Sequence, residues 1–289
     1  MSTVRVIARM DIKGPNLVKG IHLEGLRVLG RPEVFARHYY LEGADELFYQ
    51  DVVASLYGRN SLLALVARTA REIMIPLTVG GGLRSLADIR AALRAGADKV
   101  ALNTAAVARP ELVREAAESF GSSTVMVAIE AIRQPDGRFL CYTDNGREET
   151  GLEAFAWAEQ AQELGAGELL ITSVDQEGTG QGLDLELIQG VAACATVPVI
   201  AHGGAGTAEH LAEAVLTGGA DAVAVAGMLH YDLVRRADVR PLDEVGEGNL
   251  EFLKKNIDFR LVDKMSVAAL KERLTGLGVP CRNDPWSAA

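Results

Sequence analysis

Two glycine-rich turns that recur at a nearly constant offset constrain the fold of this chain more than any other feature. Residues 78–85 read TVGGGLRS and residues 200–207 read IAHGGAGT, and each stretch follows an apolar run. A Gly-Ala-Asp sequence comes after each turn, at residues 96–98 and 219–221. The recurrence of both features in the same order indicates an internal duplication.

Strand and helix patterns alternate along the whole chain. Apolar or β-branched runs, typical of buried strands, occur at residues 4–10, 46–50, 75–79, 99–102, 124–129, 168–172, 197–201 and 222–226. Amphipathic stretches predict helices at 32–43, 60–72, 85–95, 109–119, 152–164, 184–194, 207–217 and 266–276. Strands that alternate with helices of this length form parallel βαβ units, and eight such units close into a barrel.

The repeat extends to residues 42–47 (EGADEL) and 164–169 (LGAGEL). We therefore expect an α/β fold, a (β/α)8 TIM barrel built from two duplicated (βα)4 halves. A chain of 289 residues with 48% hydrophobic content can bury such a barrel as a single domain over residues 1–289. The alternative is an open doubly wound sheet, but its GxGxxG turn would follow the first strand, where this chain reads IARMDIKGPN.

Composition and charge argue against several classes of function. The formal net charge of −10 and the pI near 5.1 disfavour binding to nucleic acid or to an anionic membrane surface. The sequence shows neither a signal-like leader nor a long apolar span, so we expect a soluble, cytoplasmic protein. Three cysteines without CxxC spacing and five histidines without an HExxH pattern indicate no disulfide framework, metal site or cofactor.

The glycine-rich turns predict phosphate binding at the mouth of the barrel. In this fold the active site lies at the carboxyl ends of the strands, where backbone N–H groups of such turns often hold phosphate. The expected donors are Gly81, Gly82, Asn103 and Thr104 in the first half, and Gly178, Gly203, Gly204 and Gly227 in the second. Alternatively, the glycines only permit tight turns, and His202 either touches a phosphate or packs.

Two carboxylates occupy equivalent places in the two halves. Asp11 follows the first strand and Glu130 follows the fifth, so both side chains should enter the mouth from opposite sides. They are candidates for a general acid and a general base. Alternatively, each is a structural carboxylate that pairs with a neighbour such as Lys13 or Lys19.

A second charged set stands at or near the starts of strands, and its members are Arg5, Glu46, Lys99 and Glu168. Inward-pointing side chains at these positions would reach the bottom of the barrel, where two cations and two anions can form a closed ring of salt bridges. The simpler interpretation is a set of surface ion pairs, each worth ~0–1 kcal/mol.

Taken together, these motifs resemble the cyclase subunit of imidazole glycerol phosphate synthase. The similar segments are Asp11, Lys19-Gly20, GADEL at 43–47, TVGGG at 78–82, GADKV at 96–100, NTAA at 103–106 and GGAG at 203–206. The resemblance covers residues 1–231 nearly without gaps and resumes at 266–282.

The resemblance implies an ammonia-dependent synthase with no cofactor. A separate glutaminase subunit at the amino-terminal face of the barrel would release ammonia at the charged ring. At the mouth, a ribulose-containing bisphosphate would be cleaved and closed into imidazole glycerol phosphate, with release of an aminoimidazole carboxamide ribotide. The family's first-strand acid/base residue corresponds to Asp11, and its loop lysine at the substrate corresponds to Lys19.

Several residues depart from the family pattern. Glu130 stands where the family has an aspartate, and a displacement of ~1 Å can cost ~10²-fold in rate. Arg9 replaces a cysteine, and Glu177 replaces an aspartate at the substrate site. His202 and Gly227 replace small hydroxyl-bearing residues near the second phosphate. This cluster suggests an altered substrate.

An insertion relative to the family occupies residues 232–265. Because it follows the eighth strand, we expect it to lie over the catalytic face, where it could act as a lid. Apolar residues such as Phe252 and Leu253 favour an ordered segment. An oligomer contact is the alternative.

Three functions are compatible with this sequence. The first is the cyclase-type lyase itself. The second is a paralogue that uses ammonia on a different phosphorylated sugar or nucleotide, and the third is a non-catalytic scaffold that channels ammonia from a glutaminase to another enzyme. The related isomerase of the same pathway is also a two-half barrel, but it needs no ammonia entrance, and fold alone does not separate these functions.

Overall fold

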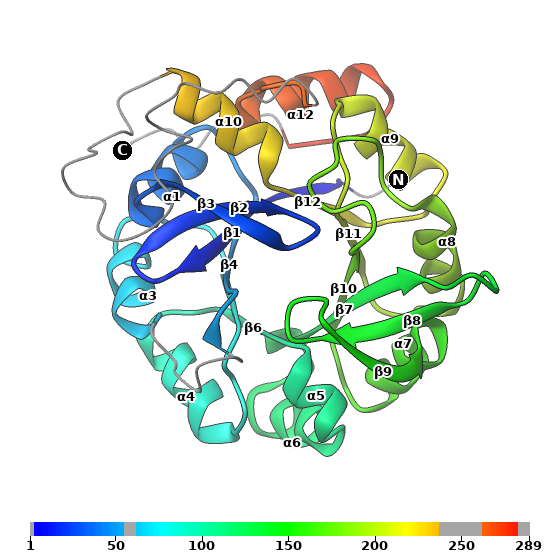
Figure 1. The fold of residues 1–289 in the computed structure, drawn as a ribbon. Helices are drawn as coiled ribbons and strands as arrows, with labels where there is room; N and C mark the ends of the chain where they lie inside the picture. The colour runs from blue at the N-terminus through cyan, green and yellow to red at the C-terminus, as the bar shows by residue number, and fades with distance from the viewer. Residues whose placement is uncertain (1–2, 55–61, 237–261, 283–289) are drawn as a thin grey trace.

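Eight parallel strands close into a barrel, which confirms the predicted fold class (Figure 1). The computed structural model describes residues 3–54, 62–236 and 262–282. The barrel strands are β1 (Arg5–Lys13), β4 (Glu46–Asp51), β5 (Leu77–Gly80), β6 (Lys99–Leu102), β7 (Val125–Arg133), β10 (Glu168–Ser173), β11 (Val199–His202) and β12 (Ala222–Val225). Each strand pairs in parallel with the next, and β12 pairs with β1 to complete the barrel.

Helices cover the outside of the barrel (Figure 1). Their bounds are α1 (Pro32–Leu41), α3 (Leu63–Thr69), α4 (Leu86–Ala95), α5 (Thr104–Ala108), α6 (Glu111–Phe120), α7 (Ala154–Glu163), α8 (Leu185–Cys194), α9 (Ala208–Leu216), α10 (Gly227–Arg236) and α12 (Val267–Gly276). The predicted helices are present, although the first two residues of the one predicted at 60–72 lie outside the described residues. The sequence patterns did not indicate α5 and α10. In the described segments, none of the helices is both long and apolar enough to cross a membrane.

Two antiparallel hairpins extend the first strand of each half, and the sequence patterns did not indicate them. β2 (Asn16–Ile21) and β3 (Glu24–Gly30) follow β1, whereas β8 (Phe139–Thr143) and β9 (Glu148–Glu153) follow β7. Asp144 and Asn145 adopt positive φ angles at the tip of the second hairpin, and an Asp-Asn-Gly sequence is a signal for such a turn. The equivalent placement of the hairpins supports the predicted duplication.

An aspartate after each of three helices explains the recurring Gly-Ala-Asp sequence. The carboxylates of Asp45, Asp98 and Asp221 accept hydrogen bonds from the backbone N–H groups of Val6, Leu77 and Val199 at 2.8, 2.9 and 2.9 Å, respectively. The glycine two residues before each aspartate has a positive φ, between 80° and 113°, which is the conformation that ends many helices. The motif therefore ends a helix and fixes the start of the adjacent strand.

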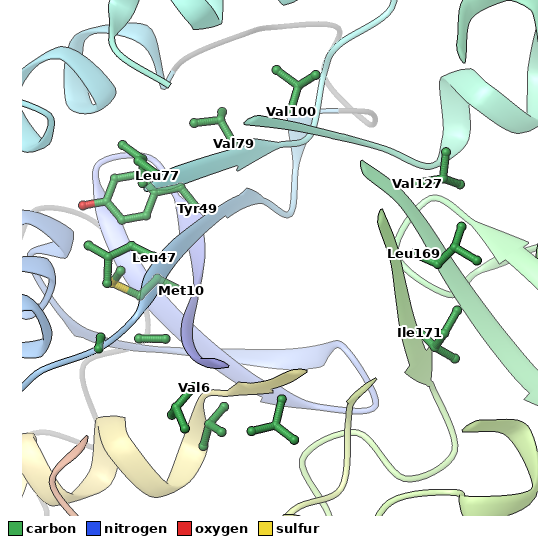
Figure 2. Close-up of a cluster of buried hydrophobic side chains, with 14 of the residues drawn as sticks. Val6, Met10, Leu47, Tyr49, Leu77, Val79, Val100, Val127, Leu169 and Ile171 are labelled. Atoms are coloured by element: carbon green, nitrogen blue, oxygen red, sulfur yellow. The ribbon is translucent and has the colours of Figure 1, made fainter. Parts of the chain in front are cut away.

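Apolar side chains pack on both sides of the barrel wall. Figure 2 shows Val6, Met10, Leu47, Tyr49, Leu77, Val79, Val100, Val127, Leu169 and Ile171 on the outer side of the strands. Residues between them in the sequence face the interior, where Ile7, Phe48, Met126, Leu170 and Ile200 are at most 2% exposed. This alternation follows from strand geometry, in which successive side chains point to opposite faces.

A buried lysine joins the last helix to the start of the barrel. Lys271 on α12 is 2% exposed, donates a hydrogen bond to the backbone oxygen of Gly43 at 2.6 Å and pairs with Asp45 at 2.7 Å. Beyond the helix, Cys281 forms a parallel bridge with Val4. Since Asp45 also binds the backbone of β1, this contact connects the C-terminal segment to the first two barrel strands.

Replacement of Lys271 by methionine should lower the free energy of unfolding by about 2–4 kcal/mol, because it removes the donor to a buried carbonyl and the partner of Asp45. Urea unfolding followed by circular dichroism measures the change. Arg273→Ala, on the same helix, removes only an exposed pair with Glu209 and should cost less than about 1 kcal/mol. Equal losses in the two variants would contradict the anchoring role of Lys271.

Candidate functional site

The carboxyl ends of the strands surround a cavity of about 430 Å³ on the side of the first half. Its wall contains the four predicted phosphate-binding residues of that half, Gly81, Gly82, Asn103 and Thr104. Glu130 also lines the cavity, as do Arg9 and Thr172. The volume is in the range of ~300–1,000 Å³ that is usual for small-molecule sites.

A second, smaller hollow of about 30 Å³ lies beside the glycine-rich turn of the second half. The other predicted substrate residues line it: Lys19, Glu177, Gly178, Gly203, Gly204 and Gly227. The two turns follow β5 and β11, which stand half a barrel apart in the strand order. The structure therefore places the two predicted phosphate sites on opposite sides of the mouth.

Both turns require glycine for the fold itself. Gly81 and Gly204 have φ angles of +93° and +102°, a conformation that other residues rarely adopt. A side chain at Gly81 would collide with the backbone oxygen of Asp51, and one at Gly204 would collide with that of Gly182. Close packing thus accounts for these glycines without a ligand, and phosphate binding stays a prediction.

Asp11, at the mouth end of β1, is paired with Arg9. Nε of Arg9 donates to Oδ1 of Asp11 at 3.1 Å, and both side chains are buried. Nη1 of Arg9 lies 3.4 Å from Oγ1 of Thr172 and 3.1 Å from Nδ1 of His202. The ion pair of Asp11 is therefore with Arg9, and not with one of the neighbouring lysines that the sequence suggested.

His202 is a buried, neutral residue of this network. Burial, followed by the nearby cations of Arg9 and Lys19, lowers the pKa of His202 well below its usual value. A neutral ring can accept a hydrogen bond from Arg9 at Nδ1. His202 thus packs in the interior and lines the second hollow, and its contact with a phosphate stays a prediction.

Glu130 lies at the mouth end of β7, opposite β1 in the strand order. Its Oε2 accepts a hydrogen bond from the backbone N–H of Gly146 at 2.9 Å. Burial raises the pKa of Glu130 to about 7, although the Arg9 cation and the Gly146 N–H lower it. A carboxyl group with this pKa can carry a proton near neutral pH, which is what a general acid requires.

A buried ion pair joins the tip of the first hairpin to the loop after β10. Lys19 and Glu177 are in contact and are 4% and 1% exposed. The Glu177 carboxylate also accepts a hydrogen bond from the N–H of Leu23 at 3.0 Å, and its backbone oxygen accepts one from the N–H of His22 at 2.8 Å. Burial disfavours the charge of Lys19, but Glu177 and Asp11 outweigh it and raise the pKa of Lys19. We call the Lys19–Glu177–Leu23 contact the hairpin latch.

At the opposite end of the barrel, the four predicted charged residues form a closed ring. Arg5 pairs with Glu46 at 2.9 Å and with Glu168 at 2.8 Å, and Lys99 pairs with the same two carboxylates at 2.9 Å each. Thr78 donates a further hydrogen bond to Glu46 at 2.6 Å. The ring predicted from the sequence is thus present, whereas its role as an ammonia entrance stays a prediction.

The predicted insertion at 232–265 is only partly described. Residues 232–236 are the last residues of α10, and residues 237–261 lie outside the described part of the chain. At the far flank, Val262 lines the second hollow, and the N–H of Asp263 donates to the backbone oxygen of Gly206 at 2.7 Å. This flank therefore contacts the mouth of the barrel, and the lid itself stays a prediction.

The described residues offer groups for anions more than for metals. Among them, no three His, Cys, Asp or Glu side chains gather in a way that could hold a metal ion. Arg9 and Lys19 are buried cations beside the two hollows, and the glycine-rich turns supply backbone donors.

Comparisons with known proteins agree with this geometry. A family model described as "Histidine biosynthesis protein" matches residues 5–235. Imidazole glycerol phosphate synthase subunit HisF from Legionella pneumophila is 56% identical over 209 residues, which cover 72% of this chain and 99% of that protein. The HisF subunit of Myxococcus xanthus is 50% identical over 80% of this chain and 90% of its own length. The HisF subunit of Thermobifida fusca is 48% identical over 82% of this chain and 94% of its own length.

The chain belongs to the HisF family. The family resemblance seen in the sequence is thereby confirmed. The sequence indicated Arg9 only as a departure from the family, and it did not indicate Thr172, which Arg9 contacts. Nor did it indicate the second hairpin. Asn145 at the tip of that hairpin donates a hydrogen bond to the backbone oxygen of Leu23 at 2.9 Å. These contacts link residues far apart in the sequence, and no local signal indicates them.

Glu177→Gln should loosen the hairpin latch, because Lys19 loses its charged partner and the Leu23 N–H loses a charged acceptor. Hydrogen exchange of the His22 and Leu23 amides should become about tenfold faster or more. Mass spectrometry of peptides from this hairpin measures the change. Glu186→Gln, which removes an exposed pair with Arg133, should leave exchange in the hairpin unaltered. Unchanged exchange in Glu177→Gln would show that the latch does not hold the hairpin.

Proposed function

We propose that this chain is the cyclase subunit of an imidazole glycerol phosphate synthase, a lyase that uses ammonia from a glutaminase partner. The observation that carries the proposal is the placement of Asp11 and Glu130 at the mouth ends of opposite strands, in a barrel whose two glycine-rich turns line two hollows at the same end. The bisphosphate substrate would be converted into imidazole glycerol phosphate and an aminoimidazole carboxamide ribotide. The complex would act in the cytoplasm on soluble metabolites.

The substrate would span the mouth with one phosphate on each side. The larger cavity would hold one phosphate at Gly82, Asn103 and Thr104, and the second hollow would hold the other at Gly203 and Gly204. Between them, the reacting carbons would lie near the two carboxylates, where cleavage and ring closure need proton transfers. Lys19 and Glu177 of the hairpin latch line the second hollow, so a phosphate bound there would lie beside the latch.

Ammonia would reach the site through the interior of the barrel. The charged ring surrounds the lower end, and the side chains above it are apolar, including Ile7, Phe48, Leu170 and Ile200. An apolar passage favours neutral ammonia over the ammonium ion, since a charge pays a large desolvation cost there. The glutaminase would therefore bind at the amino-terminal face, around the ring.

Asp11→Asn should reduce ammonium-dependent turnover of the bisphosphate substrate by about 10²–10⁴-fold, because it removes a proton-transferring carboxylate. Product formation by the isolated chain, followed by chromatography at a pH that supplies free ammonia, is the measurement. Asp136→Asn, at an exposed hairpin turn, is the matched control and should retain activity. The proposed activity is wrong if the parent chain, with an excess of the bisphosphate substrate, forms no product from ammonium salts and none with a glutaminase partner.

Lys99→Met should separate the two nitrogen sources. Breaking the ring on one side leaves Glu46 and Glu168 with Arg5 alone, so ammonia made by a bound glutaminase should enter less efficiently. Glutamine-dependent turnover should fall by about tenfold or more, while ammonium-dependent turnover, supplied from the open mouth, should change little. Lys99→Arg keeps the charge and should preserve most of the coupled activity. Equal losses with both nitrogen sources would argue against an entrance at the ring.

A second function is favoured by the charges at the mouth. Arg9 is neutralised by Asp11 and Lys19 by Glu177, so both buried cations already have an anionic partner. A paralogue acting on a different phosphorylated sugar or nucleotide, or a scaffold that passes ammonia onward, would account for this pairing. Glu130→Asp discriminates: turnover of the bisphosphate only in this variant would indicate a site adapted to another substrate, and silence in both chains would favour the scaffold.

A further inference from the structure

Arg9 is a buried cation that the proposed reaction does not yet use. It lies on the inner side of β1, above Ile7, and is 2% exposed. Its guanidinium lies 5.5 Å from the centre of the Phe48 ring on β4 and reaches Thr172 on β10 and His202 on β11. The side chain therefore lies between the apolar interior around Ile7 and the carboxylates, and it lines the larger cavity.

The two carboxylates at the mouth have unequal partners. Asp11 is ion-paired with Nε of Arg9 at 3.1 Å. In the described part of the chain, the hydrogen bond that Glu130 accepts comes from the neutral N–H of Gly146 at 2.9 Å. A buried carboxylate with a cationic partner is stabilised as the anion, whereas one without such a partner more readily keeps its proton.

The other charged groups around the two carboxylates reinforce this difference. Lys19, from β2, also acts on Asp11, and His202, from β11, is neutral. The negative charges of Asp11, on β1, and of Asp144, in the turn between β8 and β9, raise the pKa of Glu130. The more distant Arg9 cation lowers the pKa of Glu130. Glu177 forms its ion pair with Lys19 in the hairpin latch.

We propose that Arg9 is a positioning residue that divides the proton-transfer roles, because it holds Asp11 as the anion that accepts a proton and leaves Glu130 as the group that donates one. The assignment rests on the proposed ammonia-dependent reaction. Contacts of Nη1 with Thr172 on β10 and His202 on β11 fix the guanidinium, so its Nε stays directed at Asp11. A pKa of about 7 for Glu130 agrees with its role as the donor.

Neutral substitutions of Arg9 test the assignment without turnover. The carboxyl groups of Asp11 and Glu130 are followed by ¹³C NMR across a pH titration of the full chain, and their signals are assigned with Asp11→Asn and Glu130→Gln. Arg9→Gln removes the charge but keeps hydrogen-bonding groups for Thr172 and His202. Arg9→Met is the second neutral variant, and Arg9→Lys is the conservative one.

In Arg9→Gln, the midpoint of Glu130 should rise by about one pH unit, because the Arg9 cation no longer lowers its pKa. The carboxyl signal of Asp11 should change in the same variant, because it loses the ion pair with Nε of Arg9. Arg9→Lys should shift both signals less. Arg133→Met, on the same strand as Glu130 but exposed, should shift neither. If Arg9→Gln does not fold, Arg9→Met supplies the same comparison.

Turnover gives an independent measurement of the roles. At a fixed concentration of free ammonia, kcat should fall as pH rises through about 7, and this alkaline limb should move upward in Arg9→Gln, because the donor Glu130 keeps its proton to higher pH. An Asp11 carboxyl signal and a Glu130 titration that are the same in Arg9→Gln and in the parent would overturn the inference. Absence of turnover in the parent would refute the proposed function, while the titrations would still decide the role of Arg9.

Discussion

The parallel ladder between β12 and β1 is the contact on which the rest of this structure depends. It joins the last strand of the second half to the first strand of the first half, and so turns an open sheet into a closed barrel. Closure brings the carboxyl ends of all eight strands to one mouth, where Asp11 and Glu130 face each other. At the other end, Asp45, Asp98 and Asp221 fix where strands begin, and the charged ring of Arg5, Glu46, Lys99 and Glu168 joins the starts of four strands.

Two buried ion pairs determine the character of the mouth. Arg9 with Asp11 and Lys19 with Glu177 place four charged groups where water is largely excluded. Loss of one partner from such a pair leaves an uncompensated charge, which is more costly than the pair is stabilising. The pairs therefore hold the first hairpin and the first strand in place. Among the residues that the structure describes, no cation forms an ion pair with Glu130, which accepts its hydrogen bond from the Gly146 N–H. The same two ion pairs therefore stabilise the fold at the mouth and surround the residues of the proposed reaction.

Local signals explain which predictions succeeded. The period of apolar residues indicated all eight barrel strands, since a strand buried on both faces reads as a short apolar run. The repeat indicated that Asp11 and Glu130 would be counterparts, and closure of the barrel placed them opposite each other. The hairpins were missed, although Asp144-Asn145-Gly146 carries a turn signal, because their antiparallel pairing with β1 and β7 is a contact that no local sequence pattern specifies. Nor did the repeat reveal that Asp98 and Asp221 bind the backbone of the preceding strands.

The sequence by itself determined the order of strands and helices, the duplication, the family and the residue types that reach the mouth. Periodicity, turn residues and motifs are properties of neighbouring positions, so they can be read from the chain. Tertiary structure alone decided the partners: Arg9 on β1 meets His202 on β11, Lys19 meets Glu177, and Glu130 accepts a hydrogen bond from the backbone N–H of Gly146. These contacts depend on barrel closure and on the hairpins, which set distances between residues far apart in the sequence. The electrostatic balance at the mouth is a property of that arrangement, because burial and the nearest charge determine whether a carboxyl group keeps its proton.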